Sequence, residues 1–404
     1  MEKEFLTKTS RSVTLNVTGG KIDSFREQEE TTGTVRVYEN GCIGVAGCLG
    51  TPDEAALEKK AVKALALGIP YPCKLDGALE REEAHDEEII SVPRFIPTMQ
   101  RFLDRLGEMC PRFAFSNKIS LNDERAEYRN SQGRHLVSAG RSIDINLLAQ
   151  NRGSGNLFDT GLSYEGNCFD EDGLLAQFKK EYDAFYTPAD IEPGRYPVVM
   201  TAYGLFGTFL QHFVAEMYVS GASLLSGKLG QKVFSDNLSL RNDMNPATNP
   251  GARFFDEEGC VAPDLRPALI EKGTLTGLLT TKKSAEQFGL SNLGTAAAAY
   301  DGVPSLGFNQ FYVDPTAQTL RELAPGRAVY VVMASGGDAT PDGHFATPVQ
   351  MAYLMEDGEL VGRLPDLNIS GSFYDMLGKD YLGAVRRGLK PGYLQCAVTM
   401  DVTR

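Results

Sequence analysis

The first fifty residues alternate between apolar and polar side chains. Segments 11–17, 21–29 and 34–47 follow the two-residue period of strands that are buried on one face. Asn40-Gly41 interrupts the third segment and can supply the positive φ angles of a two-residue hairpin turn. We therefore predict a meander of short strands over residues 11–48.

The rest of the first half mixes helical and strand periods. A capping box at Thr51 and Glu54 predicts a helix to Gly68, a second helix opens at Pro97, and a third covers 171–185. Between them lie an alternating strand near 113–121, a turn at 131–133 and a charge run, 80–88, that predicts a solvated loop with an exposed His85. Because no regular βαβ order emerges, we predict an α+β fold.

The second half is punctuated by glycine. Segments 269–279 and 354–364 share the pattern L-x-E-x-G-x-L-x-G-x-L, and 37–45 is a shorter relative. Each places a polar-Gly pair between alternating apolar residues, as a tight β-hairpin requires. The repeated pattern can reflect either a duplicated unit or the recurrence of a generic hairpin. We predict two domains: an α+β domain at 1–190 and a mainly antiparallel β domain at 191–404.

An uncharged stretch joins the two halves. Residues 196–215 carry no formal charge, and the segment 203–230 predicts a buried helix at the junction. Prolines, glycines and polar residues within it argue against a membrane span. His212 and Glu216 are one helical turn apart, which could give two metal ligands, with Cys396 or His344 as a third. A coincidence of spacing is the favoured interpretation.

Other chemistry is sparse. Asp256, Glu257 and Glu258 could offer an acid/base pair, but three acids before a glycine more often form a turn. His344 lies in a segment rich in turn residues, where a solvated histidine is the ordinary interpretation. The sequence has neither a phosphate-binding G-x-x-x-x-G-K-[ST] nor a G-x-S-x-G elbow. Nucleotide binding by that loop and serine hydrolysis are therefore disfavoured.

Charge and cysteine content limit the expected binding partners and cellular location of the protein. Forty lysines and arginines against 53 acids give a net charge of −13, which disfavours direct contact with nucleic acid or an anionic membrane. The seven cysteines are scattered without C-x-x-C pairs, as expected of reduced thiols. No apolar signal segment opens the sequence. We expect a cytoplasmic protein.

The order of several motifs resembles the TldD/PmbA family, whose members are known as modulators of DNA gyrase and are assigned as metallopeptidases. The motifs are GLFG (204–207), SGKLG (226–230), FFDEEG (254–259) and ALIEKGTLTGLL (268–279), followed by a short segment at 285–289. The first half is similar more loosely, through the hairpin and helix at 34–61. The resemblance implies an α+β N-terminal domain and a barrel-like C-terminal domain.

The same resemblance bears on the metal. Family members that hold zinc carry H-E-x-x-x-H on the helix before the SG-x-x-G motif, and counting back from Ser226-Gly227 places those positions on Phe206, Gly207 and Gln211. A phenyl ring and a glycine offer no donor atom, and a carboxamide is a poor zinc ligand. The family's third ligand is a cysteine near the C-terminus, the region of Cys396.

The chain therefore resembles the metal-free subunit, called TldE or PmbA, which pairs with a zinc-bearing homologue. This implies no cofactor in this chain, zinc in a TldD-like partner, and peptides or unfolded segments as substrate. A homodimer is the alternative assembly. Two other functions stay open: a stand-alone hydrolase with a metal site at His212, Glu216 and Cys396, and a non-enzymatic binding protein that modulates gyrase.

Overall fold

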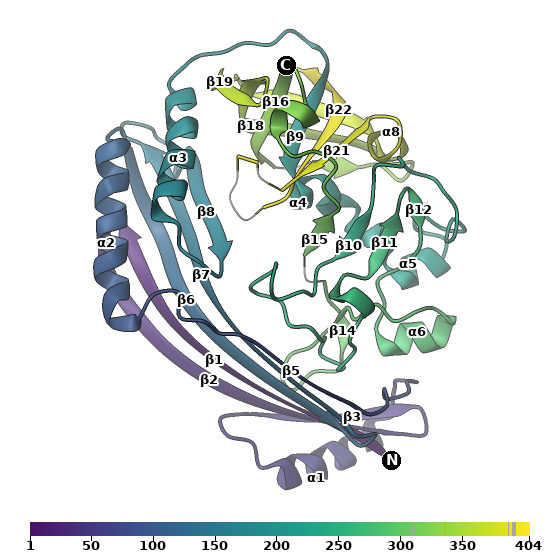
Figure 1. Ribbon diagram of the computed structural model, residues 1–404. Helices are drawn as coiled ribbons and strands as arrows, with labels where there is room; N and C mark the ends of the chain where they lie inside the picture. Colours follow the sequence, from purple (N-terminus) through teal and green to yellow (C-terminus); the bar gives the residue numbers. More distant parts are fainter. Residues whose placement is uncertain (309, 336, 387, 390–392) are drawn as a thin grey trace.

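A long curved sheet organises the first half of the chain (Figure 1). The structure is a computed structural model that describes residues 1–308, 310–335, 337–386, 388–389 and 393–404. The sheet order is β4-β3-β2-β1-β6-β7-β5, with β8 also paired to β7. Its strands are β1 (Glu2–Thr18), β2 (Lys21–Glu39), β3 (Cys42–Leu49), β4 (Ile69–Pro70), β5 (Leu79–His85), β6 (Phe113–Asn130), β7 (Arg134–Asn151) and β8 (Thr160–Gly166).

The meander is confirmed, but with fewer and longer strands. Segments 21–29 and 34–39 belong to one strand, β2, that pairs with β1 along its whole length. The predicted turn is present, with φ of 50° at Asn40 and 74° at Gly41. The charge run at 80–88 was predicted as a loop, which is wrong: residues 79–85 form β5, parallel to β7. Charged side chains suit it because an edge strand keeps one side in water.

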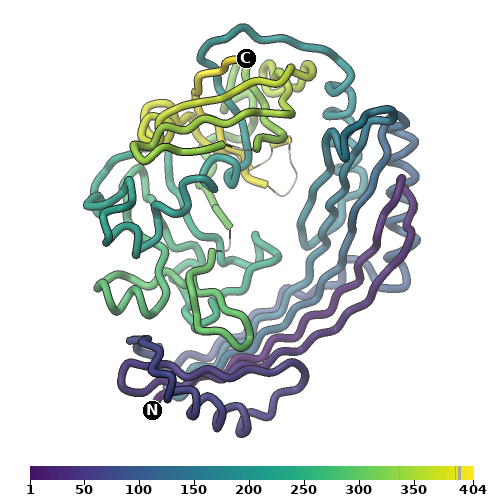
Figure 2. The backbone as a smooth tube through the Cα atoms, turned by 180° about the vertical axis from the view of Figure 1, so that it is seen from behind, coloured from purple at the N-terminus to yellow at the C-terminus, as the bar shows by residue number. Residues whose placement is uncertain are grey.

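The long strands bury opposite faces at their two ends. On β1, Glu4 and Leu6 are buried under the C-terminal half, whereas Leu15 and Val17 on the other face belong to the core with α2 and α3. The parity of buried positions changes near Ser10, which is exposed. Both views place the C-terminal half on the concave side of the sheet (Figures 1 and 2). The middle of the concave face is therefore polar.

Three helices accompany this sheet. They are α1 (Glu54–Ala64), α2 (Val92–Met109) and α3 (Glu171–Phe185). The third has the predicted bounds. The first is capped by Asp53, whose carboxylate accepts from the Ala56 N–H, rather than by Thr51. The second begins five residues before Pro97, which is accommodated inside the helix near its start.

The second half contains a closed barrel of five strands, as the resemblance implied. Its order is β16-β9-β22-β20-β18, and β18 returns to pair with β16. Only the β16–β9 pair of the ring is parallel, so the barrel is mixed. The ring strands are β9 (Gly194–Thr201), β16 (Arg327–Ala334), β18 (His344–Glu356), β20 (Leu367–Ser372) and β22 (Gln395–Thr403).

Shorter elements surround the barrel. The repeated motif forms the hairpins β11–β12 and β18–β19, with positive φ at Lys272-Gly273 and Asp357-Gly358, so both hairpin predictions are confirmed. The remaining strands are β10 (Leu240–Asn242), β11 (Ala268–Glu271), β12 (Thr274–Leu275), β13 (Ala296–Ala297), β14 (Ser305–Leu306), β15 (Phe311–Val313), β17 (Asp338–Ala339), β19 (Glu359–Arg363) and β21 (Tyr381–Val385). The helices are α4 (Ala202–Phe206), α5 (Ala215–Val219), α6 (Lys282–Phe288), α7 (Leu320–Leu323) and α8 (Phe373–Leu377).

The junction is not the single helix that the sequence predicts. It divides into α4, a 3₁₀ segment at Gly207–Phe213 and α5, followed by turns to residue 230. Val214 between them is extended, with φ −72° and ψ 128°, and forms a parallel bridge with Leu279. The Ala215 N–H donates to the Leu279 carbonyl at 3.1 Å. This tertiary pairing interrupts the helix.

The hydrophobic core crosses the predicted domain boundary. One cluster unites Phe113 and Phe178 of the first half with Tyr330 and Met351 of the barrel. The division at residue 190 stays a prediction. Within the described part of the chain, no helix is both long and apolar enough to cross a membrane.

Candidate functional site between the sheet and the barrel domain

The positions matched to the family's metal motif lie on different sides of the junction. The Phe206 side chain is fully buried, and its ring centroid is 5.6 Å from that of Phe311. Gln211, five residues later, is exposed, and Gly207 opens the 3₁₀ segment between them. Phe206 therefore fills the space between the junction and β15 with a packed aromatic ring.

His212 is a structural residue of the junction. Its side chain is buried, and its Nδ1 accepts a hydrogen bond from the Leu224 N–H at 3.3 Å. Its carbonyl accepts from the Ser223 hydroxyl at 2.6 Å. Burial lowers the pKa of the imidazole, so the ring is neutral at neutral pH. These contacts fix the turn that follows α5.

The other candidate ligands are not gathered around His212. Glu216 is exposed on α5, beyond the break at Val214, and His344 is exposed at the start of β18. Cys396 is buried in the barrel wall opposite Met200, and burial raises the pKa of its thiol to about 12. Among the described residues, no group of three or more His, Cys, Asp or Glu side chains could hold a metal.

A variant can test whether the junction could regain a metal site. Phe206→His, Gly207→Glu and Gln211→His together restore the order H-E-x-x-x-H. We expect this triple variant to bind no stoichiometric zinc, because position 206 faces the core and position 211 faces solvent. Metal analysis of the purified variant would check this. One tightly bound zinc per chain would contradict the geometry.

A buried cluster of charges lies where the C-terminal half meets the sheet. Glu257 accepts from Lys8 at 3.1 Å and pairs with Arg253. On the sheet, the fully buried Arg36 donates to Glu4 at 2.9 Å and to the Glu257 carbonyl at 2.6 Å. The segment 254–259 therefore packs against the sheet, where the Glu257 carboxylate pairs with Lys8 of β1 and the Glu257 carbonyl accepts from Arg36 of β2.

Two further carboxylates of this segment interact closely. Asp256 accepts three backbone N–H groups, at 2.9 to 3.0 Å, and Glu258 accepts from the Tyr71 hydroxyl at 2.7 Å and the Lys282 N–H at 2.8 Å. Burial, and then the neighbouring Asp256, raise the pKa of Glu258 to about 8. Burial also raises the pKa of Asp256, but its three amide donors favour the anion, so the proton of the pair resides on Glu258.

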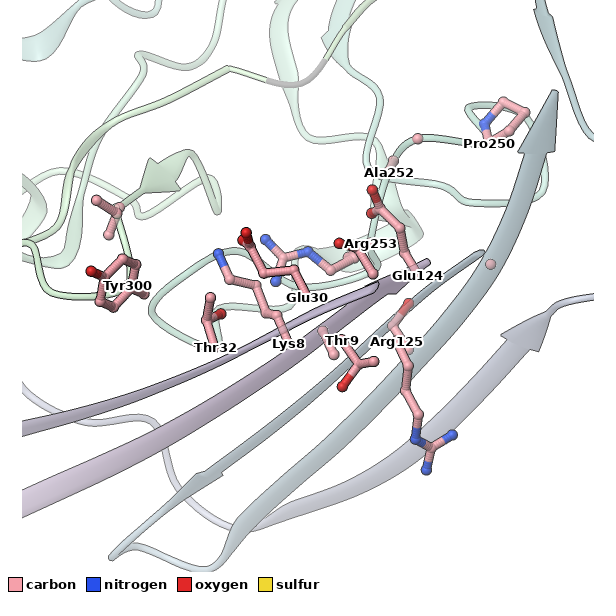
Figure 3. Close-up of a pocket in the computed structure, with 17 residues that line it drawn as sticks. Lys8, Thr9, Glu30, Thr32, Glu124, Arg125, Pro250, Ala252, Arg253 and Tyr300 are labelled. Carbon is pink, nitrogen blue, oxygen red and sulfur yellow. The ribbon is translucent and has the colours of Figure 1, made fainter. Parts of the chain in front are cut away.

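Next to this cluster is an open polar cavity of about 380 Å³ (Figure 3). Its floor is the concave face of the sheet, and its walls are the segments 250–253 and 298–300. Lys8, Glu30 and Glu124 rise from the floor, and Arg253 approaches from the wall (Figure 3). Arg125 points to the opposite side of the sheet. This cavity is the candidate binding site.

Sequence reasoning missed this site. The triple acid at 256–258 was interpreted as a turn, and the turn exists, since the Gly259 N–H donates to the Asp256 carbonyl at 3.0 Å. Its burial was not predicted, because the partner cations lie up to 249 residues away in sequence. The alternation of Lys8 and Ser10 on one strand was the one available signal, but it does not identify the covering segment.

The sequence of this chain is similar to those of known metalloproteases. Residues 193–386 match the model of the PmbA/TldA metallopeptidase C-terminal domain. A metalloprotease of Archaeoglobus fulgidus is 24% identical over 401 residues, which span 92% of this chain and 89% of that protein. The chain is a homologue of the TldD/PmbA-family metalloproteases. A zinc metalloprotease TldD homologue of Saccharolobus solfataricus is 24% identical over 274 residues, 63% of this chain and 61% of that protein.

Solved structures of two other proteins share the whole fold. TldE from Thermococcus kodakarensis superposes with a TM-score of 0.82 and 19% identity, covering 100% of this chain and 96% of that one. A Thermotoga maritima protein, named for a proposed role as modulator of a DNA gyrase, gives 0.79 and 18% over the same shares. At these identities the likeness establishes the fold: the curved sheet and the barrel belong to a known architecture.

Proposed function

We propose that this chain is the metal-free, TldE-type subunit of a two-chain zinc metallopeptidase that cleaves peptides or unfolded polypeptide segments. In this proposal a TldD-like homologue supplies the zinc and the water-activating glutamate. The present chain completes the chamber in which the substrate is held. We place the pair in the cytoplasm.

The observation that carries the proposal is the packing of Phe206. A zinc ligand at this position would need a donor atom directed at a shared open site. Phe206 instead contributes a buried ring to the barrel-domain core. The likeness to TldE over the whole chain supports the same assignment. A stand-alone hydrolase would need another metal site, and the residues that we considered for it lie on separate elements.

Reconstitution tests the proposed function. Purified alone, the chain should contain substoichiometric zinc and release no product from an unstructured peptide. Co-purified with a homologue that carries H-E-x-x-x-H, it should form a stable heterodimer that cleaves the peptide. Zinc content, mass in solution and product formation are the three measurements.

A matched control separates pairing from catalysis. A partner variant in which the glutamate of the motif is replaced by glutamine should still pair but should not cleave. Stoichiometric zinc and cleavage by the lone chain would refute the proposal. Recovery of a topoisomerase, but of no metal-bearing homologue, from cells would favour the gyrase-modulating function instead.

A further inference from the structure

The outer margin of the curved sheet includes a stretch of β2 that no neighbouring strand covers (Figure 1). β2 pairs with β1 along its whole length, but β3 covers only its C-terminal part. Other contacts close the two ends of the rest: the Ile22 N–H donates to the Gln100 side chain of α2 at 3.1 Å, and the Thr31 carbonyl accepts at 2.8 Å from the residue after β3. Within the described part of the chain, residues 24–30 are therefore a free sheet edge.

The hydrogen-bond pattern shows which backbone groups of this edge point outward. In an antiparallel sheet, alternate residues direct both their N–H and their C=O to the same neighbour. Thr31 faces the β3 side, because its carbonyl accepts from the residue after β3. The register with β1 is continuous from Ser24 to Thr31, so Phe25, Glu27 and Glu29 face the same side. Three N–H donors and three carbonyl acceptors therefore point away from the sheet.

The side chains along this edge are mainly acidic. Residues 24–30 are all exposed and carry one arginine against three glutamates. Glu29 pairs with the exposed Arg11 at 3.1 Å, whereas Glu27 forms no ion pair within the described ranges of the chain. Phe25 lies on the same face as these two glutamates and is 55% exposed. An approaching strand therefore meets two carboxylates and an aromatic ring on one face.

The sheet is also hollowed beside this edge, on the face that carries α2. An open cavity of about 560 Å³ crosses β2, β1 and β6 there, and residues 88–90 line it as well. Glu27 and Glu29 lie at its β2 end, and its floor includes the apolar side chains of Val13 and Leu121. A polypeptide that reaches this place finds a free strand edge with an apolar depression next to it.

A second copy of this chain is a poor occupant of the edge. Two β2 edges related by a twofold axis can pair around Arg26, Glu27 or Gln28. The first register places Arg26 opposite Arg26, the second places Glu27 opposite Glu27, and the third places Glu27 opposite Glu29. Like charges directly opposite one another destabilise a strand pair. The acidic edge therefore repels its own copy, as charged edges ordinarily do, but attracts a basic strand.

We propose that the β2 edge at residues 24–30 binds an extended, basic segment of another polypeptide as an added antiparallel strand. Opposite Glu29, Glu27 and Phe25, in that order, the segment would carry two basic residues and one apolar residue, separated by single spacers. Backbone hydrogen bonds would hold the strand, and the charge pairs would select its sequence. The inference goes beyond the proposed function, because this edge lies on the outer margin of the sheet and its use needs neither zinc nor cleavage.

Binding of capped, dye-labelled heptapeptides to the purified chain tests this by fluorescence anisotropy. The reference peptide carries two lysines and a valine at alternate positions, with threonine spacers. N-methylation of the second lysine removes an N–H that faces β2 and should weaken binding by at least about tenfold, whereas N-methylation of a spacer removes an N–H that faces away and should change it by less than about threefold. Replacing both lysines by glutamates should weaken binding by at least about tenfold. No binding of the reference peptide, or equal losses from the two N-methylated peptides, overturns the inference.

Two variants of Glu27 separate the backbone contact from the charge. Glu27→Pro removes an N–H that β1 does not use, and an edge strand tolerates proline at such a position. This variant should weaken binding of the reference peptide by at least about tenfold, whereas Glu27→Gln should weaken it by about threefold, because it loses only one exposed charge pair. Equal binding by wild type and Glu27→Pro would contradict strand addition.

Amide hydrogen exchange on the wild-type chain gives a readout that does not depend on the folding of a variant. The bound reference peptide should slow exchange at Phe25, Glu27 and Glu29 by at least about tenfold and leave Arg26 and Gln28, whose N–H groups face β1, unchanged. Equal slowing at all five amides, or slowing at none, would refute the added strand. Self-association of the lone chain that Glu27→Pro abolishes would make a second copy the occupant and refute the basic partner. Cleavage by the reconstituted pair is a separate measurement, so the proposed function can stand where this edge site fails.

Discussion

Replacing Arg36 by methionine should lower the free energy of unfolding by about 3–5 kcal/mol, because it leaves the Glu4 carboxylate buried without its cation. Both side chains are about 1% exposed. Burial alone would lower the pKa of Arg36, but the interactions with Glu4, Tyr38 and Glu257 together outweigh burial and raise the pKa, so the guanidinium stays charged. Chemical denaturation monitored by circular dichroism would measure the loss.

A second substitution should recover most of that loss. Glu4 also accepts from the Tyr38 hydroxyl at Oε1, 3.0 Å, and from the Tyr128 hydroxyl at Oε2, 2.8 Å. Glu4→Gln keeps an acceptor for one hydroxyl and can donate its amide N–H to the oxygen of the other, while it removes the charge. In the Arg36→Met background it should restore stability to within about 1–2 kcal/mol of the wild type, since replacing both charges of a buried pair is often nearly neutral.

Arg11 provides the matched control for Arg36. It lies on the neighbouring strand of the same sheet and pairs with Glu29 at 3.1 Å, but both side chains are more than half exposed. Arg11→Met should cost less than about 1 kcal/mol, because exposed pairs are screened by solvent. Equal losses in the free energy of unfolding for Arg11→Met and Arg36→Met would show that burial of the Arg36–Glu4 pair does not increase the cost of removing its cation.

Local signals predicted the elements whose stability is local. The hairpins at 269–279 and 354–364 depend on a polar-Gly turn between apolar residues, and 171–185 has a helix-capping acid, Asp170, before its apolar period. These features act within a few residues, so a single sequence reveals them. The barrel was predicted only through family resemblance. Its ring closes through the pair β16–β18 and includes β9, which is distant from both in the sequence, so local patterns do not reveal it.

The wrong predictions concern elements that are determined by residues far away in the sequence. The acidic β5 strand is stabilised by parallel pairing with β7, some fifty residues away, and the junction helix is interrupted by pairing of Val214 with Leu279. The cavity requires the register of four strands together with two loops of the other half. Periodicity does not reveal which distant strand pairs with a segment or which loop covers it. The sequence therefore indicates the histidine and cysteine candidates as site residues, but not Glu30 and Glu124.

The buried Glu258 should make stability depend on pH in a direction opposite to that of an ordinary ion-paired carboxylate. Its ordinary pKa of 4.5 applies to the unfolded chain, whereas burial and Asp256 raise the folded value to about 8. Between these values the folded state holds a proton that the unfolded state releases. The free energy of unfolding therefore falls as pH rises through this window, by at most about 1.4 kcal/mol per pH unit for one group.

Glu258→Gln should remove this contribution. The amide oxygen can still accept from the Lys282 N–H, and the amide nitrogen can donate to the Tyr71 hydroxyl oxygen, as a protonated carboxyl group would, but the amide cannot ionise. The variant should match the wild type near pH 5 and exceed its stability near pH 8.5, in denaturation curves recorded across that range. Glu286 lies on α6, the helix that also contains Lys282, and forms an exposed ion pair with Lys74. Glu286→Gln should leave the pH dependence of the wild-type stability unchanged. Because other titrating groups act alike in all three proteins, identical slopes for wild type and Glu258→Gln would mean that Glu258 is already ionised in the folded state, held by Tyr71 and Lys282.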